Sequence, residues 1–161
     1  MARYRFRTSW QIAAPLAPVY AAIEDSLDWP QWWPGVVSVN QLHSGDAAGI
    51  GNVRRYCWRG RLPYRVVFDI TLAAKQPGRR LEGYACGDVC GTGIWLFAEA
   101  GDATAVQYDW LVSTSKAWMN LLAPLASPLF RWNHDWLMQR GGEALAHKLG
   151  TRLLASRHEH I

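Results

Sequence analysis

The sequence predicts an α+β domain in which a curved antiparallel sheet of about seven strands wraps around one long C-terminal helix. Apolar and polar residues alternate with a period of two over much of residues 3–115, which is typical of strands. From about Trp118 the periodicity becomes helical. Strands joined by short turns pair antiparallel, and the last helix is the one predicted element long enough to cover the apolar face of such a sheet.

The first predicted strand covers residues 3–12, with aromatic side chains on one face and arginines on the other. Two short helices follow, because Pro15 is tolerated in a first helical turn and Asp28 can cap another. The second helix lies in the stretch 28–35 (DWPQWWPG). Short helices depend on side-chain burial for their stability, so we expect at least two of its three tryptophans to act as anchors.

Six further strands are predicted between this stretch and the last helix. Clusters of glycine, proline and polar residues separate them. The glycine-rich segment 45–51 lacks the Gly-Lys-Ser/Thr ending of a phosphate-binding loop and is interpreted as a turn. The first of these strands begins at Val36, and the second contains Tyr56 and Trp58. The other four cover residues 64–74, 80–86, 92–99 and 104–115.

The last predicted helix runs over residues 129–149, which is about 30 Å of helix. Pro124 and Pro128 either break its early part or mark the entry to it. A bent sheet that wraps around a single helix leaves space beside the helix, so the sequence predicts a cavity there.

Composition narrows the class of protein. The 161 residues are one domain's length, and half of them are apolar. The net charge of +4 is spread along the chain without a basic run, which argues against nucleic acid as a partner. No apolar run reaches the ~18 residues of a membrane span, and the N-terminus does not resemble a signal peptide, so we expect a cytoplasmic location without stable membrane insertion. The oligomeric state stays open.

Metal and cofactor binding are not expected. Cys86 and Cys90 have no second pair of ligands nearby, and with Cys57 they are interpreted as reduced thiols. His158-Glu159-His160 is too short and too close to the C-terminus to predict a metal site. We therefore predict that the protein uses no metal and no cofactor.

Several segments resemble the START/Bet v 1-like (SRPBCC) helix-grip superfamily, within it the polyketide cyclase/dehydrase-like group. They are residues 10–20 (WQIAAPLAPVY), 28–35, 83–95 and 130–135. The resemblance implies a helix-grip fold with a seven-stranded antiparallel sheet and a ligand cavity between sheet and helix. It predicts a single START/Bet v 1-like domain over residues 1–150, followed at 151–161 by a helix end or frayed tail. The superfamily shares no catalytic motif, so no catalytic residue is carried over.

The inward-facing strand positions carry Trp and Tyr where a plain core relies on Leu, Ile and Val. Apolar walls with a few hydrogen-bonding groups suit a ring-bearing or lipid-like ligand, although the rings could equally fill the interior. The predicted ligand-binding residues are Trp10, Trp33, Arg54, Tyr56, Trp58, Phe68, Trp95, Tyr108, Trp110, Phe130, Asn133, His134 and Met138.

Two of these residues carry specific chemistry. Helical spacing places His134 on the face of Phe130 and Met138, where it is either a general acid/base or a buried residue that fixes where the helix docks. Arg54 either faces the cavity and selects an anionic end group, or it points outward or pairs with Asp69 or Glu82.

The leading hypothesis is a protein that binds a small hydrophobic ligand, a lipid or a polyketide-like aromatic, between the sheet and the C-terminal helix. The alternative is a cyclase or dehydratase that uses His134 as its general acid/base. A third possibility, a protein-interaction domain, would show its tryptophans as an external apolar patch.

Overall fold

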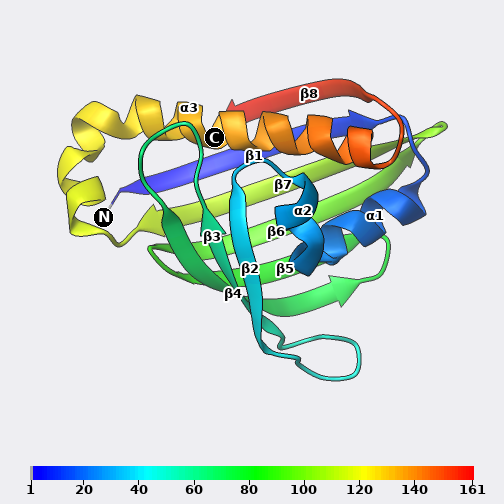
Figure 1. Cartoon of the computed structure of the whole chain (residues 1–161), viewed down its shortest axis with the longest axis horizontal. Coiled ribbons are helices and arrows are strands. Elements are labelled where there is room, and N and C mark those ends of the chain that lie inside the picture. Colours follow the sequence, from blue (N-terminus) through cyan, green and yellow to red (C-terminus); the bar gives the residue numbers. More distant parts are fainter. Residues whose placement is uncertain (1) are drawn as a thin grey trace.

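An eight-stranded antiparallel sheet curves around one long helix, α3 (Ala117–Lys148), in the computed structural model, which describes residues 2–161 (Figure 1). Two short helices, α1 (Leu16–Glu24) and α2 (Trp29–Trp32), lie between the first two strands, with a 3-10 turn between them. This architecture confirms the predicted helix-grip fold. The strands are β1 (Arg3–Ile12), β2 (Val36–His43), β3 (Val53–Trp58), β4 (Val66–Gln76), β5 (Arg80–Gly87), β6 (Val89–Ala100), β7 (Ala103–Thr114) and β8 (Leu153–His160).

The strand order is β2-β3-β4-β5-β6-β7-β1-β8, so β1 is inserted between β7 and the C-terminal strand. Every second residue of β1 is buried, as the period of two predicts. Phe6 lies opposite Trp110 of β7, and Trp10 lies opposite Val106. The buried face of this sheet and the inner side of α3 enclose the core.

The prediction of a helix end or frayed tail at residues 151–161 is wrong. Gly150, with φ of 68°, ends α3, and Thr151 donates a backbone hydrogen bond to Ala146. The chain then reverses, and β8 pairs antiparallel with β1. Without β8, β1 would be an unpaired edge of the sheet. Because β8 pairs with β1 through backbone hydrogen bonds, its side chains need not alternate between apolar and polar.

Close packing holds α3 and α2 together. Trp33 is 2 % exposed and donates its ring N–H to the carbonyl oxygen of Leu137 at 3.0 Å. A side chain on Gly141 would clash with the Trp33 ring, so this glycine is what lets the two helices meet. Trp29 donates its ring N–H to the carbonyl oxygen of Ala22 at 3.1 Å. Trp29 and Trp33 are therefore the anchors expected from the sequence.

The helix α3 remains continuous through Pro124 and Pro128, and its first turns bend away from the axis of the rest (Figure 1). Between residues 2 and 161, no helix combines the length and the hydropathy that a membrane crossing requires.

A candidate ligand pocket between the sheet and the long helix

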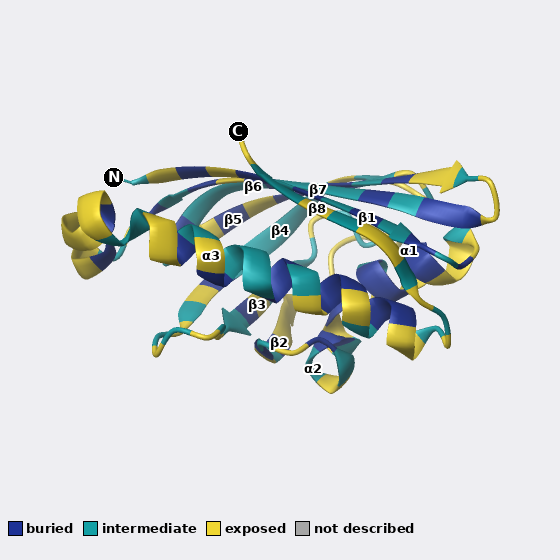
Figure 2. Cartoon of the chain, turned by 90° about the horizontal axis from the view of Figure 1, so that it is seen from above, coloured by how far each residue is buried: buried dark blue, intermediate teal, exposed yellow. Residues whose placement is uncertain are grey.

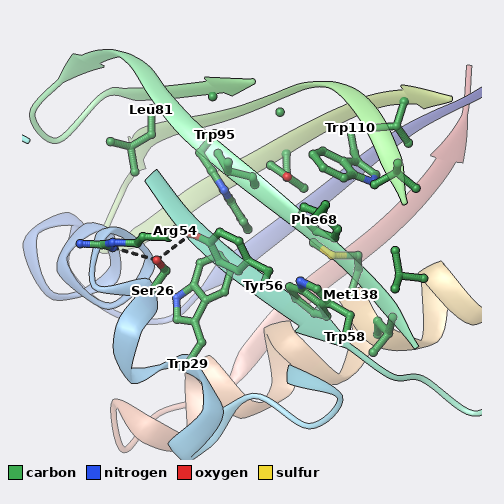
Figure 3. A pocket seen from close by; sticks show the side chains of 18 of the residues that line it. Ser26, Trp29, Arg54, Tyr56, Trp58, Phe68, Leu81, Trp95, Trp110 and Met138 are labelled. Atoms are coloured by element: carbon green, nitrogen blue, oxygen red, sulfur yellow. Dashed lines mark hydrogen bonds between the residues drawn. The ribbon is translucent and has the colours of Figure 1, made fainter. Parts of the chain in front are cut away.

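A pocket of about 480 Å³ lies between the concave face of the sheet and α3. Its walls are mainly aromatic and aliphatic side chains from β3, β4, β6, β7 and α3 (Figure 3). Gly93 of β6 faces the pocket, and a Cβ atom there would lie 2.6 Å from the hydroxyl oxygen of Tyr108. The glycine therefore keeps open space beside that hydroxyl. The volume falls within the range of small-molecule sites.

All but one of the predicted ligand-binding residues line this pocket, although their role in binding stays a prediction. Trp10 is the exception. It is 2 % exposed and lies behind the pocket, against the rings of Trp33 and Trp95, with its indole nitrogen 2.8 Å from where a Cβ atom on Gly142 would be. Here the helix approaches the sheet so closely that an inward side chain fills the core. The lining residues are Trp33, Arg54, Tyr56, Trp58, Phe68, Trp95, Tyr108, Trp110, Phe130, Asn133, His134 and Met138.

One wall is a run of stacked aromatic rings. Trp95 and Tyr108 stack with their centroids 4.1 Å apart, and Tyr108 stacks on Trp110 at 5.8 Å. Burial raises the pKa of Tyr108 well above its ordinary value, so its hydroxyl stays protonated. No group among residues 2–161 is hydrogen-bonded to this hydroxyl, which leaves it available as a donor to a ligand.

A polar cluster forms the other end of the pocket (Figure 3). Arg54 donates from Nη1 to Ser26 Oγ at 2.8 Å and to the carbonyl oxygen of Glu24 at 3.1 Å. The hydroxyl of Tyr56 lies 2.8 Å from the same Ser26 Oγ, and burial raises the pKa of Tyr56. These contacts hold the guanidinium in place against neutral groups.

The alternative in which Arg54 points outward to Asp69 or Glu82 is wrong. Asp69 pairs with Arg55, the next residue along β3, at 2.7 Å, and Glu82 pairs with Arg80 at 2.9 Å. Successive strand residues point to opposite faces, so pairing Arg55 outside directs Arg54 inside. Arg54 forms no ion pair in the part of the chain that the structure describes.

A second pair of charges borders the same end. Lys75 Nζ lies 2.8 Å from Glu24 Oε2, which also accepts a hydrogen bond of 2.6 Å from Tyr20. Burial raises the pKa of Glu24, but the hydrogen bonds from Lys75 and Tyr20, together with the positive charges of Lys75 and Arg54, outweigh it and hold that pKa below its ordinary value. Glu24 and Lys75 therefore neutralise each other. The sequence analysis missed both, since they follow from tertiary contact between α1 and β4.

Asn133 has a structural role in this wall. Its Oδ1 accepts hydrogen bonds from the backbone N–H groups of Arg61 (2.8 Å) and Leu62 (3.2 Å), and its Nδ2 donates to the Tyr64 hydroxyl at 3.2 Å. A side chain on Gly60 would overlap this amide. Asn133 thus fastens the loop between β3 and β4 to α3, and those contacts occupy both ends of its amide.

His134 lies where α3 meets β1 and β8. Its ring stacks on Phe6 with the centroids 3.8 Å apart, and its buried Nδ1 has no hydrogen-bond partner within residues 2–161. Asp135 Oδ1 lies 3.7 Å from Nδ1. Burial lowers the pKa of His134 and Asp135 only partly opposes that, so the imidazole is neutral at pH 7. His160 of β8 reaches Asp135 at 2.9 Å, a contact that the prediction of a frayed tail concealed.

A curved antiparallel sheet that holds a long C-terminal helix, with an aromatic pocket between them, defines a helix-grip protein. Within that class, the chain belongs to the family described as polyketide cyclase / dehydrase and lipid transport, whose model matches residues 3–150. None of the curated proteins matches the chain.

Solved structures share this fold at low sequence identity. The Zhui aromatase/cyclase from Streptomyces sp. R1128 is 15% identical with a TM-score of 0.72, over 92% of this chain and 94% of that one. A START superfamily protein from Mycobacterium smegmatis is 14% identical with a TM-score of 0.74, over 91% and 97% of the two chains. The di-domain aromatase/cyclase StfQ from the steffimycin biosynthetic pathway is 10% identical with a TM-score of 0.67, over 92% and 52%. At these identities the likeness shows the fold alone.

Proposed function

We propose that the protein binds a small hydrophobic ligand, either a lipid or a polyketide-like aromatic, in the pocket between the sheet and α3. The observation that carries this proposal is a pocket of about 480 Å³ with aromatic walls and two groups free to meet a ligand, the Tyr108 hydroxyl and the Arg54 guanidinium. A filled interior would not need the open volume.

The walls supply the affinity and the polar end supplies the orientation. Burying about 300 Å² of apolar ligand surface contributes about 7 kcal/mol at ~25 cal/mol per Å², before the entropy lost on association is subtracted. Arg54 favours a carboxylate or an enolate, because its guanidinium forms no salt bridge among residues 2–161 and the nearby carboxylate of Glu24 is paired with Lys75. The ligand therefore lies with its rings or chain along Trp95 and Trp110 and its acidic end at Arg54.

The test compares Arg54 with its neighbour on the same strand. A dansyl-labelled fatty acid and its neutral methyl ester are titrated into the wild type, Arg54→Gln and Arg55→Gln, with energy transfer from tryptophan as the readout. We expect Arg54→Gln to weaken binding of the acid about tenfold, the loss of one charge-assisted hydrogen bond, and to leave the ester unchanged. Arg55→Gln, whose side chain lies on the outer face, is the matched control. Absence of binding at tens of micromolar would contradict the proposal.

A second candidate function is that of a cyclase or dehydratase with His134 as the general acid/base. It is supported by a neutral imidazole on the pocket wall, with Asp135 beside its Nδ1. In such a reaction His134 takes the proton next to a ketone, Tyr108 or Arg54 stabilises the enolate oxygen, and the β-hydroxyl leaves as water with the proton that His134 returns. A β-hydroxy ketone tests this: His134→Gln should abolish the enone absorbance and leave binding intact. Equal rates in both proteins would exclude the role.

A further inference from the structure

The first half of α3 carries an apolar stripe on its outer side. Leu121 is 80 % exposed, Leu125 is 86 % exposed and Leu129 is 54 % exposed. At 100° per residue, the stripe occupies an arc of about 100°, one face of the helix. We define this stripe as Trp118, Leu121, Leu122, Leu125, Leu129 and Trp132, all of which are exposed.

The stripe is additional to the face that the fold buries. Met119, Ala123 and Phe130 of the same segment point inward, and Met119 and Phe130 line the pocket. The segment is therefore apolar on two sides, and its outer side is exposed within residues 2–161 (Figure 2). An exposed apolar patch of this kind, continuous along one helix, marks a surface that another apolar body covers.

The charges around the stripe are cationic. No Asp or Glu occurs between Asp109 and Asp135, whereas Arg131 and Lys116 lie in this interval, and Lys116 is paired with Asp88 at 3.3 Å. The loop that Asn133 fastens to α3 adds Arg61 and Arg65, both exposed and neither in an ion pair among residues 2–161. The stripe thus lies in a field that attracts an anionic surface.

The next residue along the stripe shows the same combination. Trp136 follows Trp132 by one turn, and the guanidinium groups of Arg61 and Arg140 lie over its ring at 5.9 and 5.8 Å. Leucines bordered by tryptophan and arginine match the layers of a lipid interface, in which aromatic rings and cations lie at the headgroups and aliphatic side chains lie deeper.

We propose that the stripe is a docking surface for a lipid bilayer that carries anionic headgroups. The helix would lie in the plane of the interface, its leucines in the acyl boundary and its arginines at the phosphates. Pro124 and Pro128 fit this depth, because each removes a helical donor from an earlier carbonyl, which then needs the water of the headgroup region. A second copy of the chain fits less well, since it would bring the same arginines face to face.

The inference goes beyond the proposed function, because it requires no ligand in the pocket. If both hold, docking places the wall formed by Met119 and Phe130 next to the bilayer, which gives an apolar ligand a route that avoids water.

Vesicle sedimentation tests the docking surface. The wild type, the double variant Leu121→Glu/Leu125→Glu and the control Leu154→Glu are mixed with vesicles of phosphatidylcholine alone or of equimolar phosphatidylcholine and phosphatidylglycerol. We expect the wild type to bind the anionic vesicles, with a partition coefficient that falls as salt rises. The double variant should lose at least tenfold in partitioning. Leu154, exposed on β8 far from the stripe in sequence, should be replaceable without loss.

The outcomes separate this proposal from the others. Equal partitioning of the wild type and the double variant overturns it. The proposal is also overturned if the wild type binds neither kind of vesicle, forms dimers in analytical ultracentrifugation, and becomes monomeric with Leu125→Glu. The stripe would then be covered by a second copy of the chain. The dansyl fatty-acid titration, done without vesicles, reports on the pocket independently, so failure of one proposal leaves the other measurable.

Discussion

The two halves of α3 use apolar residues in opposite ways. In residues 129–148 the inward side chains either line the pocket or pack against the sheet, and glycines at 141 and 142 let tryptophan rings meet the helix backbone. In residues 117–128 the helix bends, contains two prolines and presents Leu121 and Leu125 to the outside. In one continuous helix, packing inside the fold therefore explains the apolar residues of one half, whereas the other half carries more apolar side chains than that packing requires.

This difference separates stability from recognition. The packed half fixes the base of the pocket, since Trp33 is held both by Gly141 and by its hydrogen bond to Leu137. The exposed leucines of the other half give the fold little, because side chains that remain in water contribute no burial. Substitutions in the two halves should therefore have opposite signatures, with losses of stability in the first and losses of surface binding in the second.

The largest expected effect comes from adding one methyl group to the packed half. Gly141→Ala improves helix propensity by about 1 kcal/mol, but the new Cβ atom clashes with the Trp33 ring, which can move away only by giving up its hydrogen bond to Leu137. We expect a net loss of about 2–3 kcal/mol in the free energy of unfolding, measured by urea denaturation. Leu125→Ala in the exposed half is the larger change in side-chain size, but it should change the free energy of unfolding by less than about 0.5 kcal/mol because Leu125 is exposed. A larger loss from Leu125→Ala would reverse the comparison.

A smaller effect is expected at the junction of the halves. Asn133→Ala removes the oxygen that accepts hydrogen bonds from the backbone N–H groups of Arg61 and Leu62. Both N–H groups then lose this partner in a half-buried loop. We expect a loss of about 1–2 kcal/mol in unfolding free energy and faster amide exchange in residues 59–65. Asn133→Asp keeps the acceptor and loses the donor to Tyr64, so it should retain part of the protection. If amide exchange in residues 59–65 were equally slow in Asn133→Ala and the wild type, the loop would be ordered without its contact to Asn133.

The comparison also shows which features the sequence could predict. The period of two in β1 and β7, and the single long apolar helix, follow from local pattern and were sufficient for the fold. Arg54 and His134 were placed on the correct elements, but their alternatives could be resolved only by tertiary contacts, such as Arg55 with Asp69 and Phe6 with His134. Trp10 was misassigned because an inward strand position can face either a pocket or an approaching helix, and sequence periodicity does not distinguish them.

The strand β8 was missed for a different physical reason. Backbone N–H and C=O groups join β8 to β1, and residues of any type can supply them. Polar residues such as Arg157 and His158 can therefore occupy the strand, so its composition does not predict it. The stripe on α3 was also missed. Its leucines have helical spacing, which predicts a helix, but spacing does not tell whether an apolar face is covered.

The smallest expected effect is a pH dependence in the packed half. Burial lowers the pKa of His134 below its ordinary value of 6.5, and burial also lowers that of His158. The unfolded chain therefore binds protons at a higher pH than the folded chain, so stability is complete above about pH 6.5 and is lost as the pH falls towards the folded pKa. Asp135 and His160 face the same part of His134; burial raises the pKa of Asp135, but its contacts with His134 and His160 outweigh this and hold that pKa below its ordinary value.

Urea denaturation between pH 7.5 and pH 5.5 measures this dependence, to which one histidine can contribute at most about 1.4 kcal/mol per pH unit. His134→Leu keeps an apolar contact with Phe6 and removes the proton-binding group, so its stability should fall less steeply with acid than that of the wild type. The residual slope belongs to His158, and His158→Gln should reduce it further. Parallel curves for the wild type and His134→Leu would mean that burial does not shift the pKa of the imidazole, and that water in the pocket hydrates it in the folded protein.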